Sequence, residues 1–254
     1  MSNLEGKVAV ITGATGGIGF QVAKRLGQDG YTVVLNGIED EAGAKRVEEL
    51  AAKGITAEYY GFDVTDENAV SSNINKIGEK YGKIDVLVNN AGGLGGRSRF
   101  EDMTTEFYRF VMALNLDSAF FASRAAIPFL KKGENPSIIN YTSIAGWNAG
   151  GPGAGIYGTS KAGVHALTRA LAKDLAEYGI RVNAVSPGTI DTPFHAQIKS
   201  TKPEVFASWK NNILLGKLGQ PEEVASVISF LASEDASFIT AETIQITGGQ
   251  GLGI

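Results

Sequence analysis

The stretch Thr12-Gly13-Ala14-Thr15-Gly16-Gly17-Ile18-Gly19 decides the fold, because it joins a short apolar run at 7–12 to a segment of helical periodicity at 17–28. Glycines let the backbone turn sharply and approach a pyrophosphate, whose charge the free amides of a helix N-terminus stabilise. A strand, a glycine-rich turn and a helix in this order are typical of a dinucleotide-binding unit. We therefore expect the loop to bind the diphosphate of a nucleotide cofactor.

The same alternation of short apolar runs and helical segments continues along the chain. Further strands are expected at 32–35, 58–62, 84–89, 137–141, 181–185 and 242–246, and further helices at 41–53, 67–81, 105–130, 157–178 and from Pro221 onward. Most of these strands are almost continuously apolar, which suits a sheet covered by helices on both faces. Residues 186–219 show no regular pattern. The sequence predicts an α/β fold, a Rossmann-type doubly wound parallel sheet of about seven strands.

Length and composition predict a single domain covering residues 1–254, with a substrate loop or lid at about 188–218. The net charge of −4 includes no basic stripe or tail, so nucleic acid is not an expected partner. No secretion signal or run long enough to cross a bilayer is evident, and the chain has no cysteine. With histidines only at His165 and His195, we expect a cytoplasmic protein that binds neither membranes nor metal ions.

Tyr157 and Lys161 form the clearest candidate catalytic pair. A spacing of four places them on one face of a helix, about one turn apart. A nearby ammonium stabilises phenolate, so Lys161 is expected to lower the pKa of Tyr157 from about 10 toward neutrality and make it a general acid for carbonyl reduction. Ser143, at the end of a predicted strand, can hydrogen-bond the substrate oxygen as it gains negative charge, with Thr142 as a weaker alternative. Each of these features alone is often structural.

Several motifs together resemble the classical short-chain dehydrogenases/reductases over essentially the whole chain. They are the Gly-x-x-x-Gly-x-Gly spacing of Gly13, Gly17 and Gly19, then Asn89-Asn90-Ala91-Gly92, Asn115, Ser143, Tyr157-x-x-x-Lys161 and Pro187-Gly188, all in the family's order. The resemblance implies hydride transfer with a nicotinamide dinucleotide and a catalytic set of Asn115, Ser143, Tyr157 and Lys161. Asn115 would hold a helix kink and a water that relays protons to Lys161. Ser143 precedes Tyr157 by fourteen positions, one more than the commonest family spacing, which predicts an extended loop between them.

The resemblance also implies a cofactor site along the ends of the strands. The residues that it assigns to this site are Gly13, Thr15, Gly16, Gly17, Ile18, Gly19, Asn36, Gly37, Asp63, Val64, Asn90, Gly92, Tyr157, Lys161, Pro187, Gly188, Ile190 and Thr192. Asp63 with Val64 would contact adenine, and a strand-end cap is the alternative for Asp63. Thr192 would bind the nicotinamide carboxamide, and a simple turn or cap is its alternative.

The residue at the end of the second predicted strand indicates the cofactor preference, because family members that use NAD carry an acidic residue there. This chain has Gly37 at that position, which departs from the strict NAD pattern. No arginine or lysine stands in 36–40 or in 14–18 to bind a 2′-phosphate, and Glu39 with Asp40 would repel one. NAD(H) is therefore the expected cofactor, with NADP(H) as the alternative.

The substrate pocket is expected to be shaped by segments 92–99, 146–155 and 192–209. Their polar and cationic members favour a small anionic, hydroxylated keto or aldehyde sugar acid over a sterol or a fatty chain. The chain is also similar to bacterial reductases of 4-deoxy-L-erythro-5-hexoseulose uronate, which form 2-keto-3-deoxygluconate in alginate metabolism, at 89–97, 143–146, 151–158 and 186–196. Arg97, Gly150 and His195 are then the candidate substrate-binding residues, and the two charged or ionisable side chains are candidates for the substrate carboxylate.

Two other functions stay open at this point. A 3-oxoacyl carrier-protein reductase, or another generic alcohol dehydrogenase of the family, would want a basic docking surface and usually NADPH, and neither is evident. A non-catalytic dinucleotide-sensing protein would have no need of the intact set Asn115, Ser143, Tyr157 and Lys161. Because the family usually forms tetramers, a homotetramer is expected.

Overall fold

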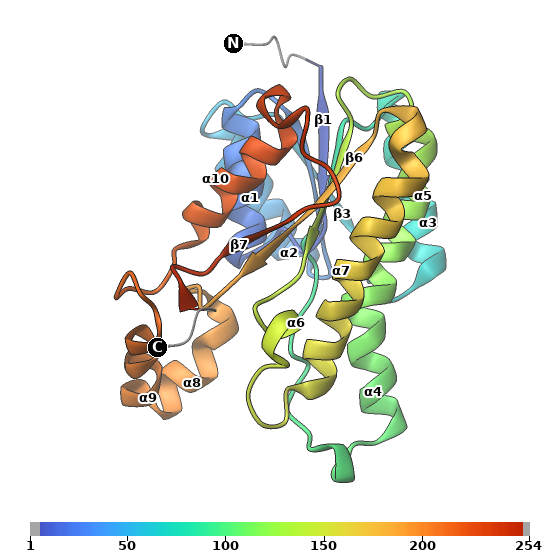
Figure 1. Ribbon diagram of the computed structural model, residues 1–254. Helices are drawn as coiled ribbons and strands as arrows, with labels where there is room; N and C mark the ends of the chain where they lie inside the picture. The colour runs from blue at the N-terminus through green and yellow to red at the C-terminus, as the bar shows by residue number, and fades with distance from the viewer. Residues whose placement is uncertain (1–5, 251–254) are drawn as a thin grey trace.

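A parallel sheet forms the centre of the computed structural model, which describes residues 6–250; residues 1–5 and 251–254 of the expected domain lie outside the described part (Figure 1). The strand order is β3-β2-β1-β4-β5-β6-β7, and all neighbouring strands are parallel. The strands are β1 (Val8–Ile11), β2 (Thr32–Gly37), β3 (Ala57–Gly61), β4 (Val86–Asn89), β5 (Ser137–Tyr141), β6 (Arg181–Pro187) and β7 (Thr243–Ile246). The order reverses between β1 and β4, where open α/β sheets bind ligands. The predicted doubly wound sheet is confirmed.

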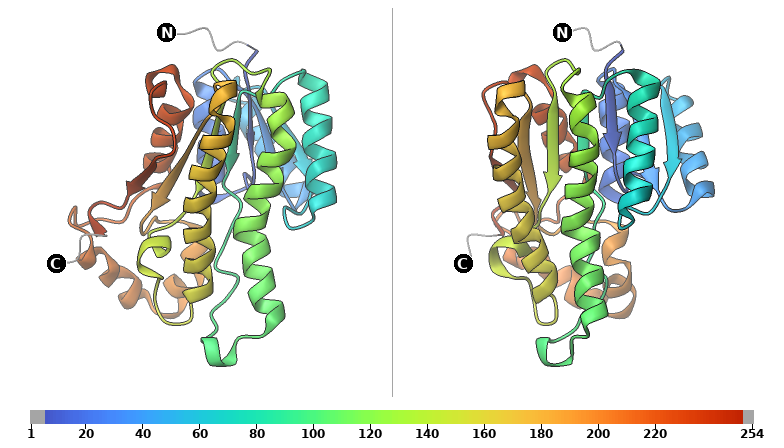
Figure 2. Two further views of the ribbon diagram at one scale, coloured as in Figure 1. Left: turned by 45° about the vertical axis from the view of Figure 1, so that its right-hand side comes forward. Right: turned by 90° about the vertical axis from the view of Figure 1, so that its right-hand side faces the viewer.

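Helices cover both faces of the sheet, as Figures 1 and 2 show. They are α1 (Gly17–Gln28), α2 (Asp40–Ala51), α3 (Glu67–Tyr81), α4 (Thr105–Met112), α5 (Ser118–Leu130), α6 (Ala145–Asn148), α7 (Gly155–Leu175), α8 (Ala196–Thr201), α9 (Pro203–Ser208) and α10 (Pro221–Ala232). Side chains alternate between the faces of a strand, so Ile11 packs with α1, α2 and α10, and Val10 with α3, α5 and α7. Two apolar cores thereby hold the strand ends, and the loops that follow them, in fixed positions.

The helix expected at 105–130 is a continuous stretch in which α4 and α5 are joined by a π-helical segment, Ala113–Asp117. By length and composition alone this stretch could cross a membrane, which the sequence analysis did not anticipate. It packs against α3 and α7 on one face of the sheet. A single such helix is weak evidence of a membrane span, because core-packing helices share its length and composition.

The segment 188–218, called the lid below, is not the irregular loop that the sequence predicted. It contains α8, α9 and the 3₁₀ turns Pro193–His195 and Trp209–Asn212. Each piece has three to six residues, too few for a helical period to show in the sequence. The lid lies beyond the carboxyl ends of β6 and β7 (Figure 1), so it can cover a ligand bound at the strand ends.

Candidate active site

The glycine-rich loop between β1 and α1 has no room for larger side chains. Gly13 has a φ of 62°, and a Cβ on it would lie 2.9 Å from the Cα of Ala91. A Cβ on Gly19 would collide with the carbonyl oxygen of Gly13. The Asn90 side chain donates to that same oxygen at 2.9 Å. The N-cap residue Gly16 offers no capping side chain, so the first-turn amides of α1 are available to an anion.

Asn115 lies in the π-helical segment between α4 and α5 and is 1% exposed. Its Nδ2 donates to the carbonyl oxygens of Gly93 and Val111, both at 2.9 Å, and its Oδ1 accepts the Gly93 N–H at 3.0 Å. A π segment interrupts the regular helix ladder, and such segments are frequent at functional sites. Asn115 thus ties the irregular part of this helix to the loop after β4.

Lys161 on α7 is a buried cation. Its Nζ donates to the carbonyl oxygen of Tyr141 at 2.9 Å, and it forms no ion pair within residues 6–250. Burial lowers its pKa to about 8. A Cβ on Gly92 would lie 3.0 Å from Nζ of Lys161 and 2.7 Å from Oδ1 of Asn115. Only glycine at this position therefore avoids a clash with these two groups.

The expected lowering of the pKa of Tyr157 by Lys161 is not found. The Lys161 Nζ lies 5.9 Å from the centre of the Tyr157 ring. Burial raises the pKa of Tyr157 above its usual value, and the nearby hydroxyl of Ser143 opposes that rise only in part. Desolvation therefore sets the direction of the shift, and the phenol is protonated at neutral pH. That is the form required of a general acid.

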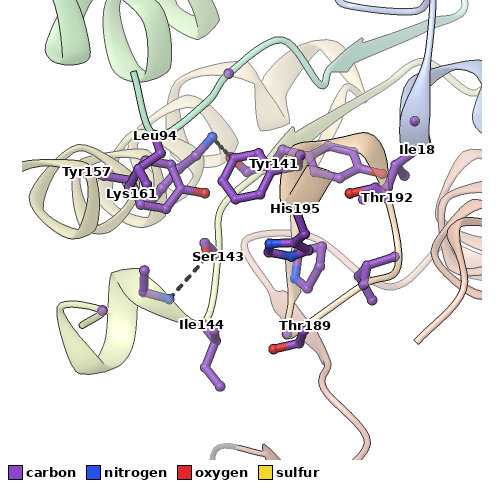
Figure 3. A pocket seen from close by; sticks show the side chains of 18 of the residues that line it. Ile18, Leu94, Tyr141, Ser143, Ile144, Tyr157, Lys161, Thr189, Thr192 and His195 are labelled. Atoms are coloured by element: carbon purple, nitrogen blue, oxygen red, sulfur yellow. Dashed lines mark hydrogen bonds between the residues drawn. The ribbon is translucent and has the colours of Figure 1, made fainter. Parts of the chain in front are cut away.

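Ser143 follows β5, and its hydroxyl accepts the N–H of Ala145 at 3.1 Å. Figure 3 shows Ser143 and Tyr157 on one side of a cavity, with His195 and Thr192 on the other. Thr142 is not a substitute for Ser143, because its buried hydroxyl donates to the carbonyl oxygen of Val185 at 3.0 Å. Of the two candidates Ser143 and Thr142, Ser143 therefore has the hydroxyl beside Tyr157.

The cavity has a volume of about 730 Å³ and reaches from the N-terminus of α1 to the lid. The predicted site residues that line it are Gly13, Gly16, Gly17, Ile18, Gly19, Asn90, Gly92, Arg97, Ser143, Gly150, Tyr157, Lys161, Pro187, Gly188, Ile190, Thr192 and His195. At one end of the cavity the glycine-rich loop carries few large side chains, and at the other end a buried lysine lies near a phenol. This combination fits a nicotinamide dinucleotide. The glycine loop would hold its diphosphate, and Tyr157 and Lys161 would hold its nicotinamide end.

Some predicted cofactor residues lie outside the cavity lining, namely Thr15, Asn36, Gly37, Asp63 and Val64. The Asn36 side chain is buried, accepts the Gly13 N–H at 3.2 Å and donates to the carbonyl oxygen of Phe62 at 2.9 Å. It therefore supports the glycine loop instead of facing a ligand. Asp63 accepts the N–H and O–H of Thr65, each at 2.8 Å, in a local turn after β3, and its contact with adenine stays a prediction. Val64 belongs to the apolar core.

Other residues that line the cavity were not predicted, among them Tyr141, Thr189, Asn212 and Gln250. The Gln250 side chain accepts the Thr189 N–H at 2.8 Å and donates to the Thr189 hydroxyl at 2.9 Å. This contact joins the loop after β6 to a residue sixty-one positions away, and no sequence pattern marks such a pair. Thr192 lines the cavity, and its hydroxyl caps no helix.

His195 in the lid lies edge-on to the rings of Phe194 and Trp209, with centroids 4.9 and 5.2 Å apart. Burial, and to a smaller extent Lys199, lowers the pKa of His195 below its usual value. The lowered pKa favours the neutral imidazole at pH 7, which can offer a substrate hydrogen bonds, and the assignment of His195 to a substrate carboxylate stays a prediction. Arg97 is then the charged candidate for a substrate carboxylate, apart from the buried Lys161 beside Tyr157.

Arg97 comes from the loop after β4 and reaches across to the loop before α7. Its Nη1 donates to the carbonyl oxygen of Pro152 at 2.9 Å. It lines the cavity and has no carboxylate partner among the described residues. The guanidinium has five donors, so most of them are left for a ligand.

Comparison with known proteins agrees with this arrangement. A family model described as enoyl-(acyl carrier protein) reductase matches residues 13–250. The chain is 40% identical over 246 residues to a 3-oxoacyl-[acyl-carrier-protein] reductase of Thermotoga maritima, covering 97% of this chain and 98% of that one. NAD+-bound xylitol dehydrogenase superposes with a TM-score of 0.90 at 34% identity, over 98% and 100% of the two chains. A short-chain glucose/ribitol dehydrogenase of Brucella melitensis gives 0.89 at 33% identity, over 98% and 99%.

Proposed function

The chain belongs to the classical short-chain dehydrogenase/reductase family and is an oxidoreductase of carbonyl and hydroxyl groups, and on this basis we propose that it reduces a small anionic, hydroxylated carbonyl compound with NADH. The leading candidate is 4-deoxy-L-erythro-5-hexoseulose uronate, reduced to 2-keto-3-deoxygluconate. A homotetramer in the cytoplasm is the proposed form of the enzyme.

The observation that carries the substrate class is the unpaired guanidinium of Arg97 at the cavity that holds Tyr157. A carboxylate of the substrate would pair with it through two parallel hydrogen bonds. The neutral ring of His195 and the side chain of Asn212 line the same cavity and would meet substrate hydroxyls. An apolar chain or ring system would form no hydrogen bond with these groups and would gain nothing from them.

In the proposed reduction the substrate carbonyl oxygen lies between the hydroxyls of Ser143 and Tyr157. The nicotinamide supplies the hydride that forms the new C–H bond when the cofactor is bound. Negative charge then grows on the oxygen, where the Ser143 hydroxyl stabilises it by a hydrogen bond. Tyr157 gives its proton to that oxygen, which completes the alcohol. Lys161 stabilises the phenolate left behind, and Asn115 fixes the loop after β4 beside it.

Cofactor preference for NADH is proposed from the adenosine end of the site. The side chains that follow β2 are Ile38, Glu39 and Asp40, all exposed, and two of them are acidic. Carboxylates there would repel the 2′-phosphate of NADPH. NAD+ is the cofactor named for the related xylitol dehydrogenase structure.

A second candidate, 3-oxoacyl carrier-protein reductase, is favoured by the similarity to the Thermotoga maritima enzyme over nearly the whole of both chains. Its substrate is a thioester on a large acidic partner, whereas the uronate is small and enters the pocket alone. The two candidates differ in their requirement for the carrier and in the ligand expected at Arg97.

The deciding experiment measures initial rates of NADH oxidation with the uronate and with acetoacetyl thioesters of carrier protein and of coenzyme A, each repeated with NADPH. Fast turnover of the uronate with NADH, absent in Tyr157→Phe, supports the proposal. Turnover of only the thioesters replaces it with the second candidate. No turnover of any of them, by protein that still binds NADH, rejects both substrates.

A further inference from the structure

Arg46 on α2 is a fixed cation at the edge of the glycine-rich loop. Its Nε donates to the carbonyl oxygen of Thr15 at 2.9 Å, and its guanidinium lies 4.3 Å above the ring of Phe20 on α1. Glu49, one turn along α2, accepts two hydrogen bonds from Nη1 at 2.9 and 2.8 Å. The Arg46 side chain is 30% exposed, so part of the guanidinium still faces solvent.

Thr15 places this cation near the adenosine ribose of a bound cofactor. A Cβ on Gly37, the position where an acidic residue is usual, would collide with the Thr15 methyl group. Arg46 and Gly37 therefore both lie next to Thr15, Arg46 at its carbonyl oxygen and Gly37 at its methyl group. In dinucleotide folds the group at the Gly37 position meets the ribose 2′-hydroxyl, and an arginine nearby can accept a 2′-phosphate. The contact of Arg46 with Thr15 was not predicted, because the two residues are thirty-one positions apart.

We propose that Arg46 is a latent anchor for the 2′-phosphate of NADPH and that Glu49 masks it, so that this pair sets the preference between the two cofactors. The inference rests on the proposed nicotinamide cofactor and deepens it. Glycine at 37 supplies no carboxylate to exclude a phosphate from the ribose itself. Exclusion then depends on Glu49 holding the guanidinium, together with the exposed acids Glu39 and Asp40.

Because Glu49 and a phosphate would compete for Arg46, we expect a single substitution at Glu49 to change the preference between the cofactors. Glu49 takes both N–H groups of Nη1 and neutralises the guanidinium, so a 2′-phosphate that approaches Arg46 must compete with this carboxylate for the cation. Glu49→Gln removes the charge and keeps the size of the side chain. The contact of Arg46 with Thr15 does not involve Glu49 and is preserved.

The test measures dissociation constants of NADH and NADPH, and of the fragments 5′-AMP and 2′,5′-ADP, by calorimetry without substrate. In Glu49→Gln the affinity for NADPH and 2′,5′-ADP is expected to rise about tenfold, as gaining one charged hydrogen bond would give, with NADH and 5′-AMP unchanged. Arg46→Gln and the double variant should lack this gain. Asp29→Asn is the matched control, because Asp29 pairs with Arg25 at the far end of α1.

Equal affinities of wild type and Glu49→Gln for 2′,5′-ADP, in protein that binds NADH normally, would overturn the role of Arg46. If Arg46→Gln weakened binding of 5′-AMP and 2′,5′-ADP equally, Arg46 would only support the glycine-rich loop. That result would also overturn its role as a 2′-phosphate anchor. Failure of the wild type to bind NADH or NADPH at all would instead reject the proposed cofactor.

Discussion

The catalytic group (Asn115, Ser143, Tyr157 and Lys161) and the lid line the same cavity or adjoin it, but they are held in different ways. Beneath the catalytic group, Asn89 on β4 donates to Asn140 on β5 at 2.8 Å, and Asn140 donates to Thr168 on α7 at 3.0 Å. All three are buried. The buried polar network therefore links the strands and the helix that carry the reacting side chains.

The lid is held to the body by surface contacts. Gln250, outside the lid, binds Thr189 within it, whereas the ion pair of Lys199 with Asp191 lies inside the lid. Phe194 and Leu215 are 53% and 71% exposed, whereas Ile190, Phe206 and Ile213 are buried, so apolar contacts anchor only part of this segment. The difference indicates that the protein core fixes the chemistry, whereas lightly packed surface segments decide which substrate is accepted.

The largest effect is expected from Tyr157→Phe, which removes the general acid. We expect kcat to fall by about 10²–10⁴-fold, with the affinity for NADH little changed. Steady-state kinetics and a separate NADH titration measure the two quantities. Tyr178→Phe, on an exposed tyrosine beyond α7, is the matched control and should retain full activity. A loss smaller than tenfold in Tyr157→Phe would remove the phenol from the chemistry.

Ser143→Ala removes a hydrogen bond that strengthens as charge develops on the substrate oxygen. A decrease in kcat of about 10²–10³-fold is expected, which is typical of losing one such donor. Thr142→Val tests the alternative hydroxyl, whose bond to Val185 makes it structural. If Thr142→Val lowered kcat more than Ser143→Ala, the assignment of the two residues would have to be exchanged.

Lys161→Met is expected to abolish activity while raising the free energy of unfolding. The pKa of Lys161 falls from 10.5 to about 8 on folding, which corresponds to roughly 3 kcal/mol of destabilisation at pH 7. The lost hydrogen bond to Tyr141 offsets about 1 kcal/mol, so the inactive variant should be about 2 kcal/mol more stable. Urea unfolding of nucleotide-free protein at several pH values measures this difference.

The sign of the pH dependence follows from the same shift. Below pH 8 the lysine is protonated in both states, and its burial opposes folding in full. Between pH 8 and 10.5 the unfolded chain still binds a proton that the folded chain has released, so the stability of the wild type gains on that of Lys161→Met. A constant difference across this range would show that Lys161 is not strained by burial.

The smallest effect is expected at Arg97, at the substrate end of the cavity. Arg97→Gln should raise KM for the anionic substrate about tenfold, the equivalent of one charged hydrogen bond, and leave kcat nearly unchanged. Arg99→Gln changes a neighbouring exposed arginine that does not line the cavity and should have no effect. Equal effects of the two variants would mean that general surface charge attracts the substrate.

The sequence predicted the parts of the molecule that depend on local patterns. The Gly13–Gly19 loop, the sheet and the Tyr157/Lys161 spacing could be read because strand and helix periods are regular and glycine at a crowded turn has few substitutes. The protonated state of Tyr157 could not be read, since burial of the side chain decides its pKa and depends on the whole fold.

Contacts between segments distant in sequence also could not be predicted. Gln250 reaches Thr189 and Arg46 reaches Thr15 only after helices and strands have packed, and neither pair lies in a motif. The short lid helices α8 and α9 were missed for another reason, because six residues form too few turns to show a hydrophobic face.

A single-turnover measurement most directly tests whether the core sets the chemistry and the lid sets the substrate. Wild type, Tyr157→Phe and His195→Gln, each saturated with NADH, are mixed with increasing concentrations of the uronate, and NADH absorbance is followed. We predict that the rate at saturating substrate falls only in Tyr157→Phe, whereas His195→Gln reaches the wild-type rate at higher substrate concentration. A saturated rate in His195→Gln as low as that of Tyr157→Phe would contradict this division of roles.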